Sequence, residues 1–161
     1  MLFPIQKQKE DKWCWAAVSA SVDNYFSSSP TMQQCTVAHD VLPALDCCVN
    51  PDLCNTGASL ELALTKVGRF KKMLLGPAKF TDICAQLNLN LPVGARIAWN
   101  QGGAHFVVIA GFSVSPSGEQ VLSIADPLFW NSTIYYKDFV SAYQAKTNGG
   151  GKWTHTYYVR P

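Results

Sequence analysis

Cys14 is the residue of this sequence best suited to act as a nucleophile. It belongs to the motif Trp-Cys-Trp-Ala-Ala at residues 13–17, at the start of a segment, 14–26, that we expect to be helical. A helix N-terminus carries partial positive charge, which stabilises a thiolate and makes it available for attack on a carbonyl carbon. A cysteine between tryptophans also fits a buried structural role, and its position alone does not separate the two interpretations.

A thiolate nucleophile works with an imidazole that moves protons, and the sequence has three histidines. His105 follows a glycine turn at 101–104 and opens the apolar run 106–112, so it lies at the mouth of a predicted core strand. His39 falls on a predicted surface helix, and His155 falls on a terminal strand between two threonines. We therefore predict His105 as the general base.

An imidazole base needs a third group that fixes its orientation, and Asp126 is the candidate. Asp126 begins an Asp-Pro pair at the end of the strand that follows the strand of His105. Antiparallel strands joined by a hairpin bring the start of one beside the end of the next. Asp-Pro also favours a turn, and a turn aspartate can still face the imidazole.

The order Gln8, Cys14, His105, Asp126 resembles that of the papain-like cysteine peptidases, which have a glutamine six positions before a Cys-Trp at a helix start. The chain is most similar to the short bacterial branch, including C39-like, staphopain-like and AvrRpt2-like enzymes. The shared features are the Cys-Trp-Ala-Ala helix start, the Gly-Gly-x-His-Phe strand and the Asp-Pro turn. Plant and lysosomal papains instead have Cys-Gly-Ser-Cys-Trp and an asparagine as the orienting residue.

This resemblance implies a catalytic triad of Cys14, His105 and Asp126. It also implies an oxyanion hole formed by the Cys14 amide and Gln8, whose spacing matches where that of Gln6 does not. The tryptophan that papains carry just after the orienting residue is displaced here, so Phe129 and Trp130 are expected to cover the His–Asp pair. Trp99, Asn100 and Trp130 are candidate walls of a substrate pocket, or simply packing residues.

The function implied is that of a cysteine endopeptidase without a cofactor, acting on a peptide or protein substrate. An inhibitor or immunity protein is a further expected partner, and the enzyme is expected to be secreted or delivered outside the producing cell as a bacterial effector or toxin domain. The same Cys-His-Asp chemistry serves an alternative function as an amidase, deamidase or transglutaminase-type toxin. A third hypothesis is an inactive papain-like binding module. It is disfavoured because all four site residues (Gln8, Cys14, His105 and Asp126) are present.

The positions of helix and strand signals predict an α+β fold in a single domain, 1–161. Residues 1–90 read as mainly helical and 91–161 as mainly an antiparallel β-sheet, with the active-site cleft between the two halves. The expected helices span 14–26, 31–42, 59–67 and 81–87. The expected strands span 93–99, 105–114, 120–124, 133–136 and 153–159.

Composition supports a folded, non-nucleic-acid-binding protein. Apolar residues make up 48% and aromatic residues 12%, while the formal net charge is only +2. The apolar runs are too short to cross a bilayer, and the first residues of this numbering lack the pattern of a signal peptide.

Four of the six cysteines lie between positions 35 and 54, namely Cys35, Cys47, Cys48 and Cys54. Two disulfides among them are favoured over a structural zinc site that would include His39, because the spacings are irregular for zinc. Three pairings are possible, of which a bridge between the adjacent Cys47 and Cys48 would be strained. Cys84 is then a free thiol.

Overall fold

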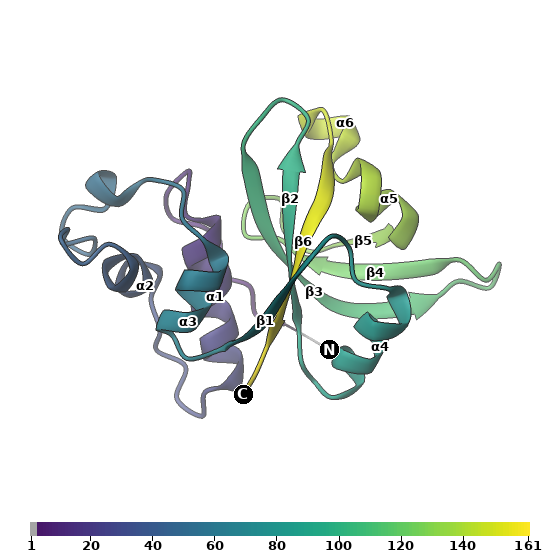
Figure 1. Ribbon diagram of the computed structural model, residues 1–161, viewed down its shortest axis with the longest axis horizontal. Helices are drawn as coiled ribbons and strands as arrows, with labels where there is room; N and C mark the ends of the chain where they lie inside the picture. Colours follow the sequence, from purple (N-terminus) through teal and green to yellow (C-terminus); the bar gives the residue numbers. More distant parts are fainter. Residues whose placement is uncertain (1–2) are drawn as a thin grey trace.

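A twisted antiparallel sheet forms the centre of the structure, a computed structural model that describes residues 3–161 (Figure 1). Its six strands lie in the order β1-β6-β2-β3-β4-β5. Their bounds are β1 Phe70–Leu75, β2 Val93–Trp99, β3 Ala104–Val114, β4 Gln120–Ala125, β5 Ser132–Tyr135 and β6 Gly151–Val159. The C-terminal strand β6 pairs with both β1 and β2, so it joins segments from the first and second halves of the chain.

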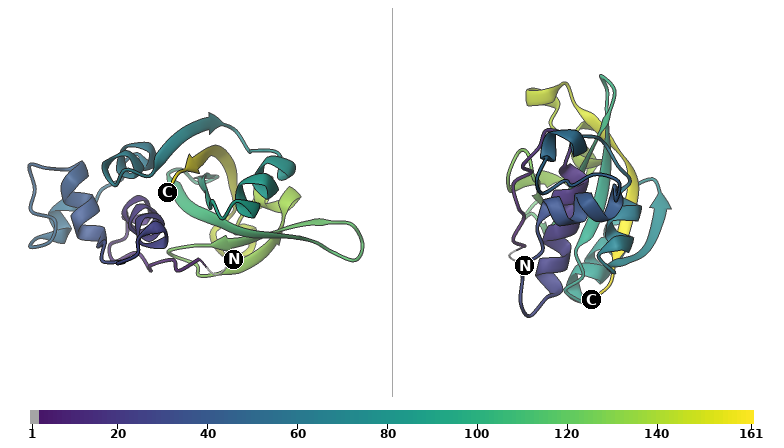
Figure 2. Two further views of the ribbon diagram at one scale, coloured as in Figure 1. Left: turned by 90° about the horizontal axis from the view of Figure 1, so that it is seen from below. Right: turned by 90° about the vertical axis from the view of Figure 1, so that its left-hand side faces the viewer.

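Three helices from the first part of the chain lie on one side of the sheet (Figures 1 and 2). They are α1 (Cys14–Phe26), α2 (Gln34–Val41) and α3 (Leu60–Lys66), with the short 3-10 helix η1 (Pro51–Cys54) between the last two. α1 contacts β3 directly, while α2 and α3 pack against α1. In the view from below, α1 accordingly lies between α2 and the sheet (Figure 2, left).

Two further helices pack against the other face of the sheet. α4 (Phe80–Asn88) contacts β2 and β3, and α5 (Tyr136–Ala142) contacts β4, β5 and β6. A last short helix, α6 (Ala145–Asn148), precedes β6. The result is the α+β architecture that the sequence predicts.

The central position of α1 follows from its composition. Trp15 and Val18 are fully buried, and the small side chains of Ala16, Ala17 and Ala20 are buried as well. All residues from Cys14 to Val22 are buried, so this part of the helix is enclosed on every side, and its alanines allow neighbouring elements to approach it closely. α1 is thereby held in place against β3.

β3 divides the protein into two cores because its side chains alternate between the faces of the sheet. Phe106, Val108 and Ala110 pack with α1 and its neighbours. Val107 and Ile109 pack on the opposite face, in the core that also includes residues of α4 and α5. The continuous apolar run in the sequence is therefore explained by burial on both faces.

The predicted helices and strands are present, with small shifts at their ends. The sequence failed to predict β1, an edge strand whose residues are mostly exposed and show no alternation. It also missed α5 and α6, and Tyr136, expected at the end of a strand, begins α5 instead. The boundary between the two halves also differs from the expected one at residue 91, because β1 and α4, within residues 70–88, already pack with the sheet.

None of the helices in residues 3–161 is both long and apolar enough to cross a membrane.

Candidate active site

Cys14 is the first residue of α1, and only 7% of the residue is exposed. No side chain caps this end of the helix. Backbone amides in the first turn, including that of Cys14, therefore lack an intrahelical acceptor. The thiol lies at the positive end of the helix dipole, next to N–H groups that can bind a negative oxygen.

His105 and Asp126 come together where β3 starts and β4 ends. The antiparallel register pairs Val108 with Ala125, which brings the turn after β4 beside the start of β3. His105 Nε2 lies 2.8 Å from Oδ1 of Asp126, and both residues are buried. The thiol of Cys14 lies close enough to the imidazole to contribute to the raised pKa of His105. The three predicted residues thus meet, with the imidazole between the thiol and the carboxylate.

The charges of these groups favour a protonated imidazole. Burial alone would lower the pKa of His105, but hydrogen bonds to Asp126 and Cys14 and the charges of both outweigh it and raise the pKa to about 9. Burial would also raise the pKa of Asp126, yet the hydrogen bond from His105 and its charge hold that pKa below the ordinary value. Asp126 is therefore a stable carboxylate beside an imidazolium.

Asp126 is fixed by donors on both of its carboxylate oxygens. Oδ1 accepts the amide N–H groups of Leu128 and Phe129, at 2.7 and 2.9 Å, in addition to the bond from His105. Oδ2 accepts a 2.6 Å hydrogen bond from the hydroxyl of Tyr143, a buried residue just after α5. The side chain of Asp126 thus both stabilises the Asp-Pro turn and orients the imidazole of His105. No local signal in the sequence predicts a role for Tyr143.

Aromatic rings cover the pair of His105 and Asp126. Trp99 stacks on the His105 ring at 5.7 Å between centroids, and Phe129 meets it edge-on at 6.0 Å. Trp99 also stacks on Tyr143. Phe129 has the covering position that the sequence predicts, but Trp130 is 58% exposed and lies under the Lys7 ammonium instead. Trp99, at the end of β2, takes the second covering position.

Gln8 lies in the segment before α1, tied by its backbone to the turn after Asp126. Its amide N–H donates to the carbonyl of Pro127 at 2.9 Å. The side chain is nearly buried, and its Nε2 donates to the carbonyls of Glu10 and Asp11 at 3.0 and 2.8 Å. Gln8 Oε1 is buried and has no partner among the described residues. This side chain therefore shapes the loop that leads into α1.

Gln6, the alternative glutamine, is directed elsewhere. Its side chain donates to the carbonyl of Met32 at 3.1 Å and accepts a 3.2 Å bond from Gln34 of α2. The other two histidines form hydrogen bonds with other groups. His39 is exposed and bonds the carbonyl of Leu45, while His155 bonds its neighbour Thr154.

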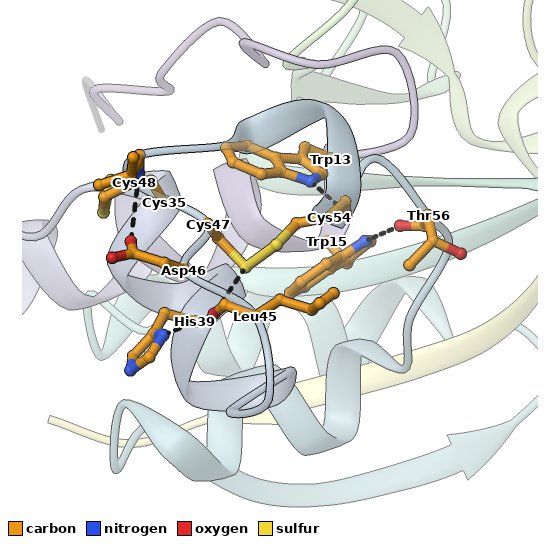
Figure 3. Close-up of a disulfide and its surroundings, with 11 residues drawn as sticks. Trp13, Trp15, Cys35, His39, Leu45, Asp46, Cys47, Cys48, Cys54 and Thr56 are labelled. Carbon is orange, nitrogen blue, oxygen red and sulfur yellow. Dashed lines mark hydrogen bonds between the residues drawn. A yellow bond between two sulfur atoms is a disulfide. The ribbon is translucent and has the colours of Figure 1, made fainter.

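The four clustered cysteines form two disulfides, as the sequence predicts. Cys35 is bonded to Cys48, and Cys47 to Cys54, which selects one of the three pairings (Figure 3). Cys14 and Cys84 are the free cysteines of the described chain. Within residues 3–161, no group of three or more His, Cys, Asp or Glu side chains is arranged to hold a metal ion.

The disulfide-bonded loop is attached directly to the residues that flank Cys14. The indole N–H of Trp13 donates to the carbonyl of Cys54 at 2.8 Å, and that of Trp15 donates to the carbonyl of Thr56 at 2.9 Å (Figure 3). The amide of Lys12 donates to Asn55 at 3.0 Å. The two tryptophans of the Trp-Cys-Trp motif therefore connect the start of α1 to Cys54, the end of the loop that the Cys47–Cys54 bridge closes, and to the residues that follow it.

A cavity of about 590 Å³ opens beside Cys14, between the helical layer and the sheet. Its apolar wall includes Trp15 and Phe106, and residues 57–59, which follow the disulfide loop, form another side. The remaining lining residues include three charged ones, Asp11, Lys12 and Arg96. Trp99, Asn100 and Trp130, which the sequence offered as pocket walls, are not among the lining residues.

Comparison with known proteins gives a family match and a similar solved structure. The family model described as "Papain-like cysteine protease AvrRpt2" matches residues 2–148. A solved structure, the Pseudomonas avirulence protein AvrPphB, is similar at a TM-score of 0.45 and 9% identity over 99% of this chain and 98% of that one. A search of curated proteins gave no match. The extent of the family match, nearly the whole chain, shows that this protein belongs to the papain-like cysteine proteases of the AvrRpt2 family.

Proposed function

We propose that the protein hydrolyses peptide bonds with Cys14 as nucleophile, His105 as general acid and base, and Asp126 as the group that orients His105. The observation that carries this proposal is the position of the His105 ring. Its Nε2 lies 2.8 Å from Asp126, which leaves Nδ1 for the thiol of Cys14 at the start of α1. This is the order of groups that thiol acyl transfer requires.

In the acylation step, the Cys14 thiolate attacks the carbonyl carbon of the scissile bond. A carbon–sulfur bond forms, and the carbonyl electron pair moves onto oxygen. The carbon–nitrogen bond then breaks as His105 gives its proton to the departing amine. In the second step, neutral His105 takes a proton from water, whose oxygen attacks the thioester. The carbon–sulfur bond breaks, the acid product leaves, and the Cys14 thiolate and protonated His105 are restored.

We assign the oxyanion hole to the backbone amide of Cys14 and the side chain of Gln8. The helix N-terminus supports the first donor, since the Cys14 amide has no intrahelical acceptor. The burial of Gln8 and its link to Pro127 support the second. Because Gln8 Nε2 already faces two carbonyls, at Glu10 and Asp11, one of its hydrogens must be shared with the oxyanion or must turn toward it.

The substrate is a protein, and we infer that the enzyme acts outside the cytosol of the producing cell. Two disulfides support this, because such bonds persist in oxidising compartments. A secreted or delivered protease can also cleave proteins of the cell that makes it. We therefore propose as a further partner an inhibitor or immunity protein that covers the cavity beside Cys14.

The proposal is tested by incubating the protein with denatured casein and identifying the fragments by mass spectrometry. We expect cleavage by the wild type and a loss of about 10³-fold or more in His105→Ala. Cys84→Ser, which removes the other free thiol, should cleave normally. Equal cleavage by the wild type and His105→Ala would exclude this mechanism.

A further inference from the structure

Arg96 is a charged residue in the wall of the cavity beside Cys14. It lies on β2, directly opposite Phe106 of β3 and His155 of β6 in the sheet register. Cross-strand partners have their side chains on the same face of a sheet. Arg96 and Phe106 accordingly both line the cavity that contains Cys14.

The guanidinium of Arg96 has no carboxylate partner in the part of the chain that the structure describes. Nη1 donates to the hydroxyl of Thr154 at 2.9 Å, and none of the ion pairs within residues 3–161 includes Arg96. An arginine carries five N–H donors, so most of them are available to a ligand. The side chain is partly buried, which keeps it in place.

The surroundings of Arg96 keep its positive charge effective. His155, its cross-strand neighbour, has a pKa that burial and then the charge of Arg96 lower, so its imidazole is neutral and does not compete with Arg96 for a carboxylate. Asp11 and Lys12 also line the cavity, on the segment that precedes Cys14. The negative charge of Asp11 and the positive charge of Lys12 offset each other, so Arg96 gives the cavity a net positive charge.

We infer that this cavity selects a substrate with an aspartate or glutamate side chain close to the scissile bond, and that Arg96 is the residue that recognises it. A guanidinium binds a carboxylate through paired, charge-assisted hydrogen bonds, and the apolar wall of Trp15 and Phe106 strengthens such a bond by excluding water. A cavity of 590 Å³ corresponds to a sphere about 10 Å across. Extended chain rises about 3.3 Å per residue, which limits the acidic position to within about three residues of the scissile bond.

This inference rests on the proposed function, and its test separates the two. A fluorogenic peptide library, randomised at the three positions on each side of the cleaved bond, is digested with the wild type and with Arg96→Gln. We expect one position at which the wild type cleaves Asp or Glu peptides at least about 10-fold faster than the matched Asn or Gln peptides, as judged by kcat/KM. Arg96→Gln should reduce that ratio to about 2-fold or less, and Arg96→Glu should favour Lys or Arg at the same position.

Lys12→Gln is the matched control, because Lys12 is a second cation that lines the same cavity. It should leave the acidic preference within about 2-fold of the wild type if recognition is specific to Arg96. Each variant is also treated with an epoxide thiol inhibitor that carries no acidic group, which reports the reactivity of Cys14 independently of the pocket. Normal labelling and cleavage without an acidic preference, or a preference that survives in Arg96→Gln, would overturn the role of Arg96 alone. Absence of labelling in the wild type would overturn the proposed function and this inference together.

Discussion

The hydroxyl of Tyr143 donates a 2.6 Å hydrogen bond to Oδ2 of Asp126, the carboxylate oxygen that His105 does not use. With Leu128 and Phe129 on Oδ1, this bond leaves Asp126 no freedom to rotate. Tyr143 is itself held by its backbone, which exchanges two hydrogen bonds with Gly151 at the start of β6. The orientation of the imidazole therefore depends on the packing of β6 and the segment after α5.

Removal of this hydroxyl should slow catalysis without unfolding the protein. We expect Tyr143→Phe to lower kcat by about 10-fold with little change in KM, because a hydrogen bond to a charged group contributes about 1.5–3 kcal/mol. The ring, which stacks on Trp99, remains. Tyr135→Phe, at an exposed position, is the control. Unchanged kcat in Tyr143→Phe across the pH range would show that the bond does not orient Asp126 for catalysis.

Replacement of Gln8 tests the oxyanion hole. Gln8→Ala should lower kcat by about 10²–10³-fold, the usual cost of losing one oxyanion donor. Gln6→Ala is the matched control, because Gln6 pairs with Gln34 and not with the site. Both variants need comparable melting temperatures, since Gln8 also fixes the loop before α1. A rise in KM at unchanged kcat in Gln8→Ala would leave Gln8 only a structural role.

Stability should depend on pH through the His105–Asp126 pair. The pKa of His105 is raised from 6.5 to about 9, so its contribution is fully present below pH 6.5 and is lost as pH rises through 9. The pKa of Asp126 is lowered, so its contribution is present above 3.8 and is lost as pH falls below that value. Thermal unfolding followed from pH 3 to 10 should therefore show a maximum between about 4 and 6.5.

His105→Gln should flatten the alkaline decline of that profile, because the substituted side chain does not titrate. His39→Gln, which removes an exposed histidine, should leave the profile unchanged. An alkaline decline of the same size in His105→Gln would assign it to another group.

The Cys47–Cys54 bridge should matter for activity as well as for stability. It closes a loop with a sequence separation of 7, for which the chain-entropy model gives a stabilisation of about 2–3 kcal/mol. We expect the double variant Cys47→Ser, Cys54→Ser to lose about that much free energy of unfolding in urea. It should also lose activity at temperatures where it remains folded, because Trp13 bonds the carbonyl of Cys54 and Trp15 that of Thr56, two residues further on.

Activity is measured at the same reductant concentration for every variant, so that the thiol of Cys14 has the same oxidation state in all of them. Cys84→Ser, which removes a cysteine outside the disulfides, is the control and should match the wild type. Full activity in the folded double variant would show that the loop does not position the start of α1.

The parts of the site that the sequence predicts are those with local signals. Cys14 at a helix start, His105 heading a core strand and Asp126 in an Asp-Pro turn each follow from neighbouring residues. The disulfide pairing did not, because bonding partners depend on how the loop folds. Tyr143 was missed because α5 was missed. The expected strand 133–136 ended at Tyr136, the residue that begins α5, and the sequence predicted no element between 137 and 147.

The role of Arg96 in the cavity wall could not be predicted from the sequence, for a related reason. Arg96 lies in the middle of an apolar strand and gave no signal of its own. Its proposed role depends on the face of the sheet that it shares with Phe106, and on the observation that Arg96 forms no ion pair within the described residues. Both depend on strand register, which is a tertiary property.

Intact-mass analysis after reaction with an epoxide thiol inhibitor tests the central claim, that Cys14 is the nucleophile activated by His105. The native protein, with its disulfides intact, should gain one inhibitor mass, and peptide mapping should place it on Cys14. Cys14→Ala should gain none, while Cys84→Ser should react like the wild type. An adduct of equal size and rate in Cys14→Ala would contradict the account.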